Sequence, residues 1–321
     1  MIVYILFAVG FVVLIKGADL LVAGSASVAK KYNVSDIVIG LTIVSMGTSM
    51  PELIVNILAS NSGACDIAIG NVIGSNISNI LLILGIAAVI YPLSIQRSTT
   101  YSEIPYSIVA LLLVAFVGNA TLFSTSHDHS ISRGDGAILM VFFALFLVYI
   151  LKLAKAGRSE LIEDAPDELL PMGKSIVFIC LGMLGLFFGG KWVVDGAVAV
   201  ATEFELSEKL IGLTIVAIGT SLPELVTSAV AAYKKNTDIA IANVVGSNIF
   251  NLLWVLGLSA IINPLNFDPQ INIDIFVLLI ASCLIIFGLG MDKYRKQLGR
   301  PAGVLFLLAY GCYIVFLVYR G

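Results

Sequence analysis

Apolar segments long enough to cross a lipid bilayer recur from one end of this 321-residue chain to the other. The hydrocarbon core of a bilayer is roughly 30 Å thick, and a helix of about 20 apolar residues spans it. Hydrophobic residues make up 59% of the chain, charged residues only 12%, and the mean hydropathy is +1.03. The sequence therefore predicts an all-α integral membrane protein in which no soluble catalytic domain is left over.

Proline, glycine and charged clusters divide the apolar sequence into ten expected transmembrane helices. These helices are expected near residues 2 to 29, 36 to 59, 66 to 90, 104 to 118, 136 to 153, 174 to 201, 208 to 232, 238 to 262, 273 to 290 and 302 to 319. One long polar connection separates five helices from five. We therefore expect a first repeat at residues 1–153, a linker at 154–173 and a second repeat at 174–321.

The basic residues predict the orientation of the chain. Residues 1–15 lack a basic start and a small-residue cleavage site, so we expect a retained helix and a mature chain that begins at Met1. Thirteen basic residues lie at the ends of odd-numbered helices and three on the opposite side. By the positive-inside rule, this distribution predicts a multi-pass protein of the cell membrane with both termini extracellular and the linker cytoplasmic.

Composition also limits the chemistry. The net charge of -3 gives no indication of nucleic-acid binding, and the expected surroundings are the lipid bilayer. Nothing in the sequence predicts a cofactor or an obligatory protein partner. The four cysteines have no paired spacing, so we expect helix-packing residues: Cys65, Cys180, Cys283 and Cys312. His127 and His129 are expected in a solvated extracellular loop.

An internal repeat is the most informative pattern in the chain. A shift of 172 residues aligns residues 20–93 with 192–265 without a gap. Gly47-Thr-Ser-Met-Pro-Glu52 returns as Gly219-Thr-Ser-Leu-Pro-Glu224, and Gly74-Ser-Asn-Ile77 returns as Gly246-Ser-Asn-Ile249. Because each copy holds five helices, an odd number, the second copy must enter the membrane from the opposite face. The predicted fold is thus two inverted five-helix repeats with a shared site near the midplane, a geometry typical of alternating access.

Glu52 and Glu224 lie near the middle of apolar helices, where an acid costs about 2.5 to 3.5 kcal/mol on insertion scales. Each acid follows a proline that cannot donate a backbone hydrogen bond, so each helix is expected to open where its acid lies. Thr48 and Thr220 stand four residues before the acids, on the same helical face. The pattern brings hydroxyl, carboxylate and backbone oxygens together.

The following helix of each copy carries polar residues spaced by four, namely Asn71, Ser75 and Asn79, then Asn243, Ser247 and Asn251. Oxygen donors without histidine or cysteine favour calcium or sodium over zinc or copper. Serine, threonine and asparagine also join helices in membranes, which is the alternative interpretation. Two intramembrane glutamates at equivalent positions of the repeat favour an ion-binding role over simple helix packing.

Other residues in these segments have structural interpretations. Asp66 and Asp238 are expected as helix N-caps. Intrahelical ion pairs are expected for Lys16 with Asp19 and for Lys191 with Asp195. Close helix approach is expected at Gly70, Gly74, Gly85, Gly246 and Gly257.

The paired Gly-Thr-Ser-x-Pro-Glu and Gly-Ser-Asn-Ile motifs resemble the alpha repeats of the sodium/calcium exchanger family, within the cation/calcium exchanger superfamily. The resemblance implies ten helices in two inverted halves, with Ca²⁺ and Na⁺ as transported ions held between the second, third, seventh and eighth. It implies that Glu52 and Glu224 bind calcium and that backbone oxygens of Ser45 and Ala217 ligate sodium. The remaining implied ligands are Thr48, Ser49, Ser75, Asn79, Thr220, Ser221, Ser247 and Asn251.

The resemblance also bears on coupling. Potassium-dependent relatives carry an aspartate where this chain has Asn251, and proton-coupled relatives use a different acidic motif, so a sodium/calcium antiporter without potassium cotransport is expected. The first and sixth helices would slide as a gate over the other eight. A calcium/proton antiporter is the alternative, because desolvation favours a protonated carboxyl group. A cation channel fits two inverted repeats less well, and a hydrolase would need a histidine base near Ser49 or Ser221.

Overall fold

The computed structural model describes residues 2–61, 65–96, 98–119, 129–156, 170–203, 217–291 and 297–320, and most of these residues are helical. Five helices are continuous: α1 (Ile2–Lys31), α8 (Arg133–Ala156), α9 (Met172–Glu203), α15 (Ile271–Met291) and α16 (Arg300–Arg320). Three further segments contain one π-helical stretch each: α5 (Cys65–Ser78), η2 (Asn79–Ile83) and α6 (Leu84–Ile90); η3 (Thr99–Glu103) and α7 (Ile104–Asn119); α13 (Thr237–Ile249), η6 (Phe250–Val255) and α14 (Leu256–Ile262).

Two segments are broken at the repeated motif. The first comprises α2 (Asp36–Ile39), η1 (Gly40–Val44), α3 (Ser45–Thr48) and α4 (Met50–Asn61), and it bends by 45° where Ser49 interrupts the helix. The second comprises α11 (Ala217–Thr220) and α12 (Leu222–Tyr233), with Ser221 at the break. The expected opening beside Pro51 and Pro223 is confirmed, because a proline two residues after each break lacks the N–H that would continue the helix.

In the described part of the chain, seven helices are long and apolar enough to cross a membrane, and the bent pair makes an eighth. The apolar stretch Ile271–Phe287 of α15 is shorter, as is the described part of the broken α11–α12 segment. Each of the ten expected segments coincides with helix, except that residues 208–216 of the seventh lie outside the described residues. The expectation of a helical membrane protein is therefore confirmed.

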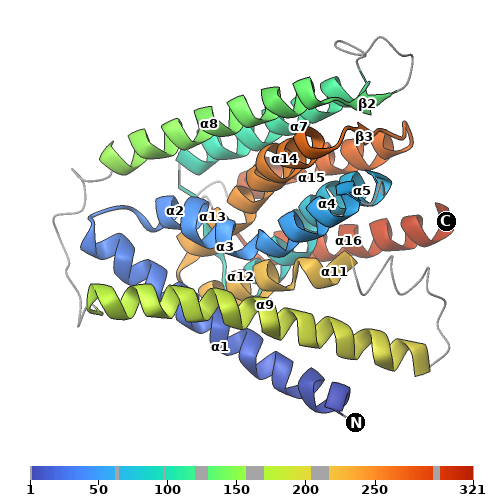
Figure 1. The fold of residues 1–321 in the computed structure, drawn as a ribbon. Coiled ribbons are helices and arrows are strands. Elements are labelled where there is room, and N and C mark those ends of the chain that lie inside the picture. Colours follow the sequence, from blue (N-terminus) through green and yellow to red (C-terminus); the bar gives the residue numbers. More distant parts are fainter. Residues whose placement is uncertain are drawn as a thin grey trace.

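Helices α1 and α9 lie together along one side of the molecule (Figure 1). Glycines allow this close approach: a Cβ atom on Gly17 would lie 2.8 Å from the backbone nitrogen of Leu186, and one on Gly182 would lie 2.7 Å from that of Leu21. We call this line of contact between α1 and α9 the glycine seam. Most of its glycines are spaced by seven within a helix and by 172 between the two helices: Gly10, Gly17 and Gly24, then Gly182, Gly189 and Gly196. The seam therefore follows the internal repeat.

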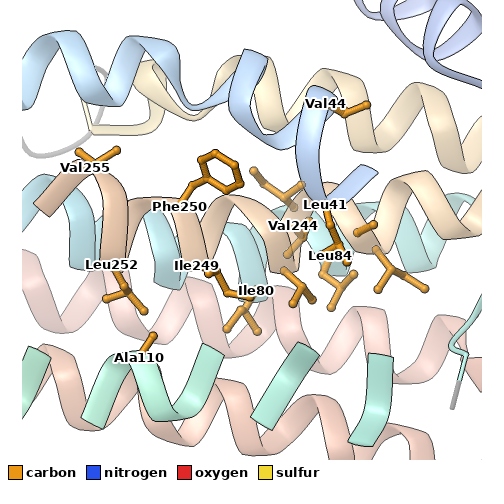
Figure 2. Packing of buried hydrophobic residues seen from close by; sticks show 14 of the residues in the cluster. Leu41, Val44, Ile80, Leu84, Ala110, Val244, Ile249, Phe250, Leu252 and Val255 are labelled. Atoms are coloured by element: carbon orange, nitrogen blue, oxygen red, sulfur yellow. The ribbon is translucent and has the colours of Figure 1, made fainter. Parts of the chain in front are cut away.

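The core lies among the helices that carry the repeated motifs. Figure 2 shows Val244, Ile249 and Leu252 of α13 and η6 among Leu41, Ile80, Leu84 and Ala110 from neighbouring helices. Phe250 and Val255 extend this cluster. These side chains are all buried, so the backbone that presents the polar residues is fixed by apolar packing on its other faces.

Two short strand pairs tie together segments distant in sequence. Strand β1 (Leu93–Ser94) pairs antiparallel with β4 (Gln297–Leu298), and β2 (Ser130–Ile131) pairs antiparallel with β3 (Leu265–Asn266). Strands β1 and β3 are separated by the repeat distance of 172, so the two pairs are equivalent features of the two halves. Two residues are too few to produce a strand pattern in the sequence.

Several local expectations need correction. Lys191 and Asp195 form the expected ion pair at 3.0 Å, but Asp19 pairs with Lys234 and not with Lys16. The N-cap of α13 is Asn236, which accepts a hydrogen bond from the backbone of Ile239, whereas Asp238 lies in the first turn. An N-cap must stand outside the helix, and α13 already begins at Thr237.

Other expectations concern glycines and cysteines. Gly85, Gly246 and Gly257 lie against neighbouring helices as expected, whereas Gly70 and Gly74 have no described atom within 4 Å of a built Cβ. Cys180, Cys283 and Cys312 are free and exposed, so the expectation that they pack between helices is wrong. The side chains of Cys65 and Asp66, with His127 and most of the linker, lie outside the described residues.

Candidate ion-binding site

Glu52 and Glu224 are fully buried, each in the first turn of the helix that follows a break. The break separates α3 from α4 and α11 from α12, and it turns both the preceding serine and the acid into the interior. These segments pack against α5–η2 and α13–η6, which carry the repeated asparagines and serines. The two motifs of each repeat are therefore neighbours in space.

The environment of Glu224 includes donors from both repeats. Ser49 donates to Glu224 Oε1 at 3.0 Å, and Ser247 donates to the same oxygen at 3.4 Å. The hydroxyls of Thr48 and Ser247 are 3.4 Å apart. Residues from both copies of the repeated motifs thus contribute donors to one carboxylate.

The threonines link the repeats in a reciprocal way. Thr48 donates to Asn243 Oδ1 at 3.0 Å, and Thr220 donates to Asn71 Oδ1 at 3.3 Å. The two hydrogen bonds are related by the 172-residue offset, with the halves exchanged. This relationship is what two equivalent units packed face to face produce.

Asn56 and Ser228 extend this network and are absent from the ligand set that the sequence predicts. Asn71 donates to Asn56 Oδ1 at 2.7 Å, and Asn243 donates to Ser228 Oγ at 2.9 Å. Both Asn56 and Ser228 are fully buried. Each stands four residues after its glutamate, so helical spacing carried the signal that could have identified them.

Seven of the thirteen buried side-chain oxygens without a hydrogen-bond partner in the described part of the chain belong to predicted ligands. Among the described residues, the buried side-chain oxygens without a partner include Glu52 Oε1 and Oε2, Ser75 Oγ, Asn79 Oδ1, Ser221 Oγ, Glu224 Oε2 and Asn251 Oδ1. The six others belong to residues outside the predicted ligand set, namely Ser25, Ser60, Ser78, Glu103, Asp135 and Thr227. Buried polar atoms normally have a hydrogen-bond partner. A bound cation would provide the partner that these buried oxygens lack.

Other predicted ligands have partners within the protein. The Ser45 hydroxyl donates to the Gly40 carbonyl at 2.6 Å, while the Ser45 carbonyl accepts from Ser49 N at 3.0 Å and from the Thr48 hydroxyl at 3.3 Å. A sodium ion at that carbonyl would therefore take the place of the Thr48 hydroxyl. Ala217 is the first described residue of α11.

Asn79 and Asn251 lie in π-helical turns, Asn79 at the start of η2 and Asn251 within η6. A π turn widens the helix and often occurs at functional sites. The sequence did not predict these turns, because the period of apolar residues barely changes over a single π turn. The structure thus adds a backbone feature to the two positions.

The donor set favours a hard cation. It consists of carboxylate, amide, hydroxyl and backbone oxygens, and the described residues contain no cluster of three or more His, Cys, Asp or Glu side chains typical of a transition-metal site. Calcium takes six to eight oxygen ligands, including carboxylates, and sodium also takes oxygen ligands.

A helical membrane protein that buries two glutamates among amide and hydroxyl oxygens belongs to the class of membrane cation carriers. The sequence profile described as "Sodium/calcium exchanger protein" matches residues 2–152 and 174–319. The chain therefore belongs to the sodium/calcium exchanger family. The two matched segments coincide closely with the two expected repeats.

Individual relatives agree with this assignment. The chain is 39% identical to the putative antiporter CaxA of Alkalimonas amylolytica, covering 94% of both chains. It is 31% identical to the sodium/calcium exchanger MaX1 of Methanosarcina acetivorans, covering 98% of both. Its fold matches the sodium-calcium exchanger NCX_Mj, soaked with 10 mM Na⁺ and zero Ca²⁺, with a TM-score of 0.82, 34% identity and 98% coverage of both chains.

Proposed function

We propose that this protein is an antiporter that moves Ca²⁺ across the membrane in exchange for Na⁺. The observation that carries the proposal is the pair of fully buried glutamates, Glu52 and Glu224, surrounded by oxygens that lack hydrogen-bond donors. Membership of the sodium/calcium exchanger family supports cation/calcium exchange, and the name of the MaX1 relative supports sodium as the counter-ion.

In this proposal the two glutamates supply the charge that a divalent ion needs, and neutral oxygens complete the coordination. The neutral ligands are Thr48, Ser49, Ser75, Asn79, Thr220, Ser221, Ser247 and Asn251, with the backbone oxygens of Ser45 and Ala217. Sodium and calcium share these oxygens, so binding of one excludes the other. No resident cofactor takes part.

We further propose ten transmembrane helices in two inverted repeats, residues 1–153 and 174–321, with both termini extracellular and a cytoplasmic linker at 154–173. Hydrogen bonds and strand pairs that recur at the 172-residue offset support equivalent halves. The distribution of basic residues supports the orientation.

An asymmetry between these halves supports the proposal of alternating access. Ser49 donates to Glu224 Oε1 at 3.0 Å, whereas Ser221, its counterpart in the second repeat, faces Glu52 without a hydrogen bond of normal geometry. Likewise α1 packs along α12, while α9 has no comparable contact with α4. In inverted repeats, exchanging these roles between halves produces an arrangement open to the other side, with α1 and α9 moving as the gate.

Calcium uptake into proteoliposomes distinguishes the proposed function from its alternatives. An outward sodium gradient should drive uptake when the pH gradient and the membrane potential are both collapsed. Uptake that requires a pH gradient and ignores sodium would identify a calcium/proton antiporter, in which the buried glutamates carry protons. Calcium flux down its own gradient without any counter-ion would identify a channel.

A further inference from the structure

Four asparagines meet where α5 and η2 pack against α13 and η6. Asn76 and Asn248 occupy the same position in the two Gly-Ser-Asn-Ile motifs, and Asn79 and Asn251 follow three residues later. All four side chains are buried. Asn79 and Asn251 belong to the predicted ligand set, whereas Asn76 and Asn248 do not.

The four amides form a closed and reciprocal set of hydrogen bonds. Asn76 Nδ2 donates to the Asn248 carbonyl at 3.1 Å, and Asn248 Nδ2 donates to the Asn76 carbonyl at 3.5 Å. Asn79 Nδ2 donates to Asn248 Oδ1 at 2.9 Å, and Asn251 Nδ2 donates to Asn76 Oδ1 at 3.1 Å. Each bond has its counterpart at the 172-residue offset with the halves exchanged.

This network determines the orientation of each asparagine amide, that is, which neighbours its Oδ1 atom and its NH₂ group face. A backbone carbonyl can only accept, so the side chains of Asn76 and Asn248 must direct their NH₂ groups toward the carbonyls. Their Oδ1 atoms then face Asn79 and Asn251, and an oxygen there requires a donor. The NH₂ groups of Asn79 and Asn251 supply it, which leaves the Oδ1 atoms of these two residues at the other end.

Those Oδ1 atoms are buried and have no hydrogen-bond partner among the described residues. If either amide turned over, it would present an NH₂ group in place of an oxygen, and NH₂ cannot ligate a cation. The orientation of the amide therefore decides whether the residue is a ligand.

We propose that Asn76 and Asn248 are positioning residues, which act across the repeat interface to keep the oxygens of Asn251 and Asn79 directed toward the transported ion. This inference rests on the proposed function in one respect only, namely that Asn79 and Asn251 contact the ion. Each ligand is oriented by the opposite repeat, so the third and eighth helices depend on each other for affinity.

The same substitution at Asn248, made in the wild type and in an Asn79→Asp variant, distinguishes a positioning role from simple packing. Asn248→Leu keeps the approximate size of the side chain but removes the acceptor that holds Asn79. We expect the affinity of the purified protein for Ca²⁺, measured by equilibrium binding of radioactive calcium, to fall about tenfold, the equivalent of about 1.4 kcal/mol. In an Asn79→Asp background both terminal atoms are oxygens, and one of them faces the Asn248 oxygen with no hydrogen between them, so the same Asn248→Leu change should cause no loss of affinity.

Equal losses in the two backgrounds would overturn the positioning role, because a purely structural residue acts regardless of what stands at position 79. The mirrored pair, Asn76→Leu with and without Asn251→Asp, repeats the test if Asn248→Leu does not yield monodisperse protein. Failure of the proposed function gives a different result, since wild-type protein would then bind no calcium at all.

Discussion

Asp19, in the middle of α1, forms an ion pair with Lys234 at the C-terminal end of α12, with 2.5 Å between Oδ1 and Nζ. The repeat-related positions are occupied by Lys191 and Ser62, which cannot form an ion pair. Lys191 instead pairs with Asp195 in its own helix. In the proposed alternating access, exchanging the roles of the repeats would therefore not recreate the contact between Asp19 and Lys234.

Reversing the charge in Lys234→Glu should shift the population away from the arrangement that contains this contact. Because the pair is partly exposed, its contribution is at most about 1 kcal/mol, so the ratio of apparent calcium affinities measured from the two membrane faces should change by up to about fivefold. The charge-swapped protein Asp19→Lys/Lys234→Asp should restore the ratio. Lys191→Glu is the matched control, since it breaks a pair within a single helix; an equal effect there would contradict the assignment.

Glu52→Gln or Glu224→Gln should abolish calcium exchange in protein that remains folded. Each substitution removes a charge that the divalent ion needs, and it also removes the cost of keeping an acid in the membrane. Radioactive calcium uptake by proteoliposomes measures the effect.

Glu103→Gln is the control for the two acids. Glu103 is also a fully buried glutamate, but it accepts a hydrogen bond from Tyr149 away from the repeated motifs, and a glutamine can accept the same bond. Exchange should continue in this variant. Wild-type uptake in monodisperse Glu52→Gln protein would show that the site is elsewhere.

Gly17→Ala should destabilise the contact between α1 and α9. Its methyl group would lie 2.8 Å from the Leu186 nitrogen and 3.0 Å from the Gly182 carbonyl oxygen, so the helices must separate. Overpacking of this kind typically costs about 1 to 3 kcal/mol, which a lower melting temperature in detergent should reveal. Gly311→Ala, with no described atom within 4 Å, should melt like the wild type, and equal melting of all three proteins would refute a tight seam.

Calcium exchange should not depend on potassium. Asn251 supplies an amide oxygen without a negative charge, so a further cation beside calcium would be poorly compensated. Uptake driven by sodium should be the same when potassium is replaced by choline on both sides of the vesicle. A strict requirement for potassium would place the protein among the potassium-dependent exchangers.

The sequence predicted the helical membrane fold and the proximity of the segments that carry the repeated motifs. Both predictions use patterns along the chain, namely the length of the apolar segments and the 172-residue repeat. The breaks beside Pro51 and Pro223 were predictable for the same reason, since proline acts locally. Contacts that depend on packing between helices could not be predicted from the sequence. Asp19 had a plausible partner three residues away, yet the packing of α1 against α12 places it beside Lys234.

The amide network illustrates the same limit at the site. Spacing placed Asn79 and Asn251 on polar helix faces and the family resemblance implied that they are ligands, but the hydrogen bonds that orient them come from Asn248 and Asn76 in the opposite repeat. Such bonds depend on the register between two helices, which the sequence of either helix does not determine. The π turns at η2 and η6 belong to the same category.

Competition between sodium and calcium tests the central claim, one site shared by both ions, most directly. Equilibrium binding of radioactive calcium to purified protein in nanodiscs should be measured over a series of sodium concentrations, with choline keeping the ionic strength constant. A shared site predicts that the apparent dissociation constant for calcium rises without limit as sodium increases, because no state holds both ions on the Glu52 and Glu224 carboxylates. A dissociation constant that reaches a plateau at high sodium would mean that both ions bind at once, and it would contradict exchange through a single site.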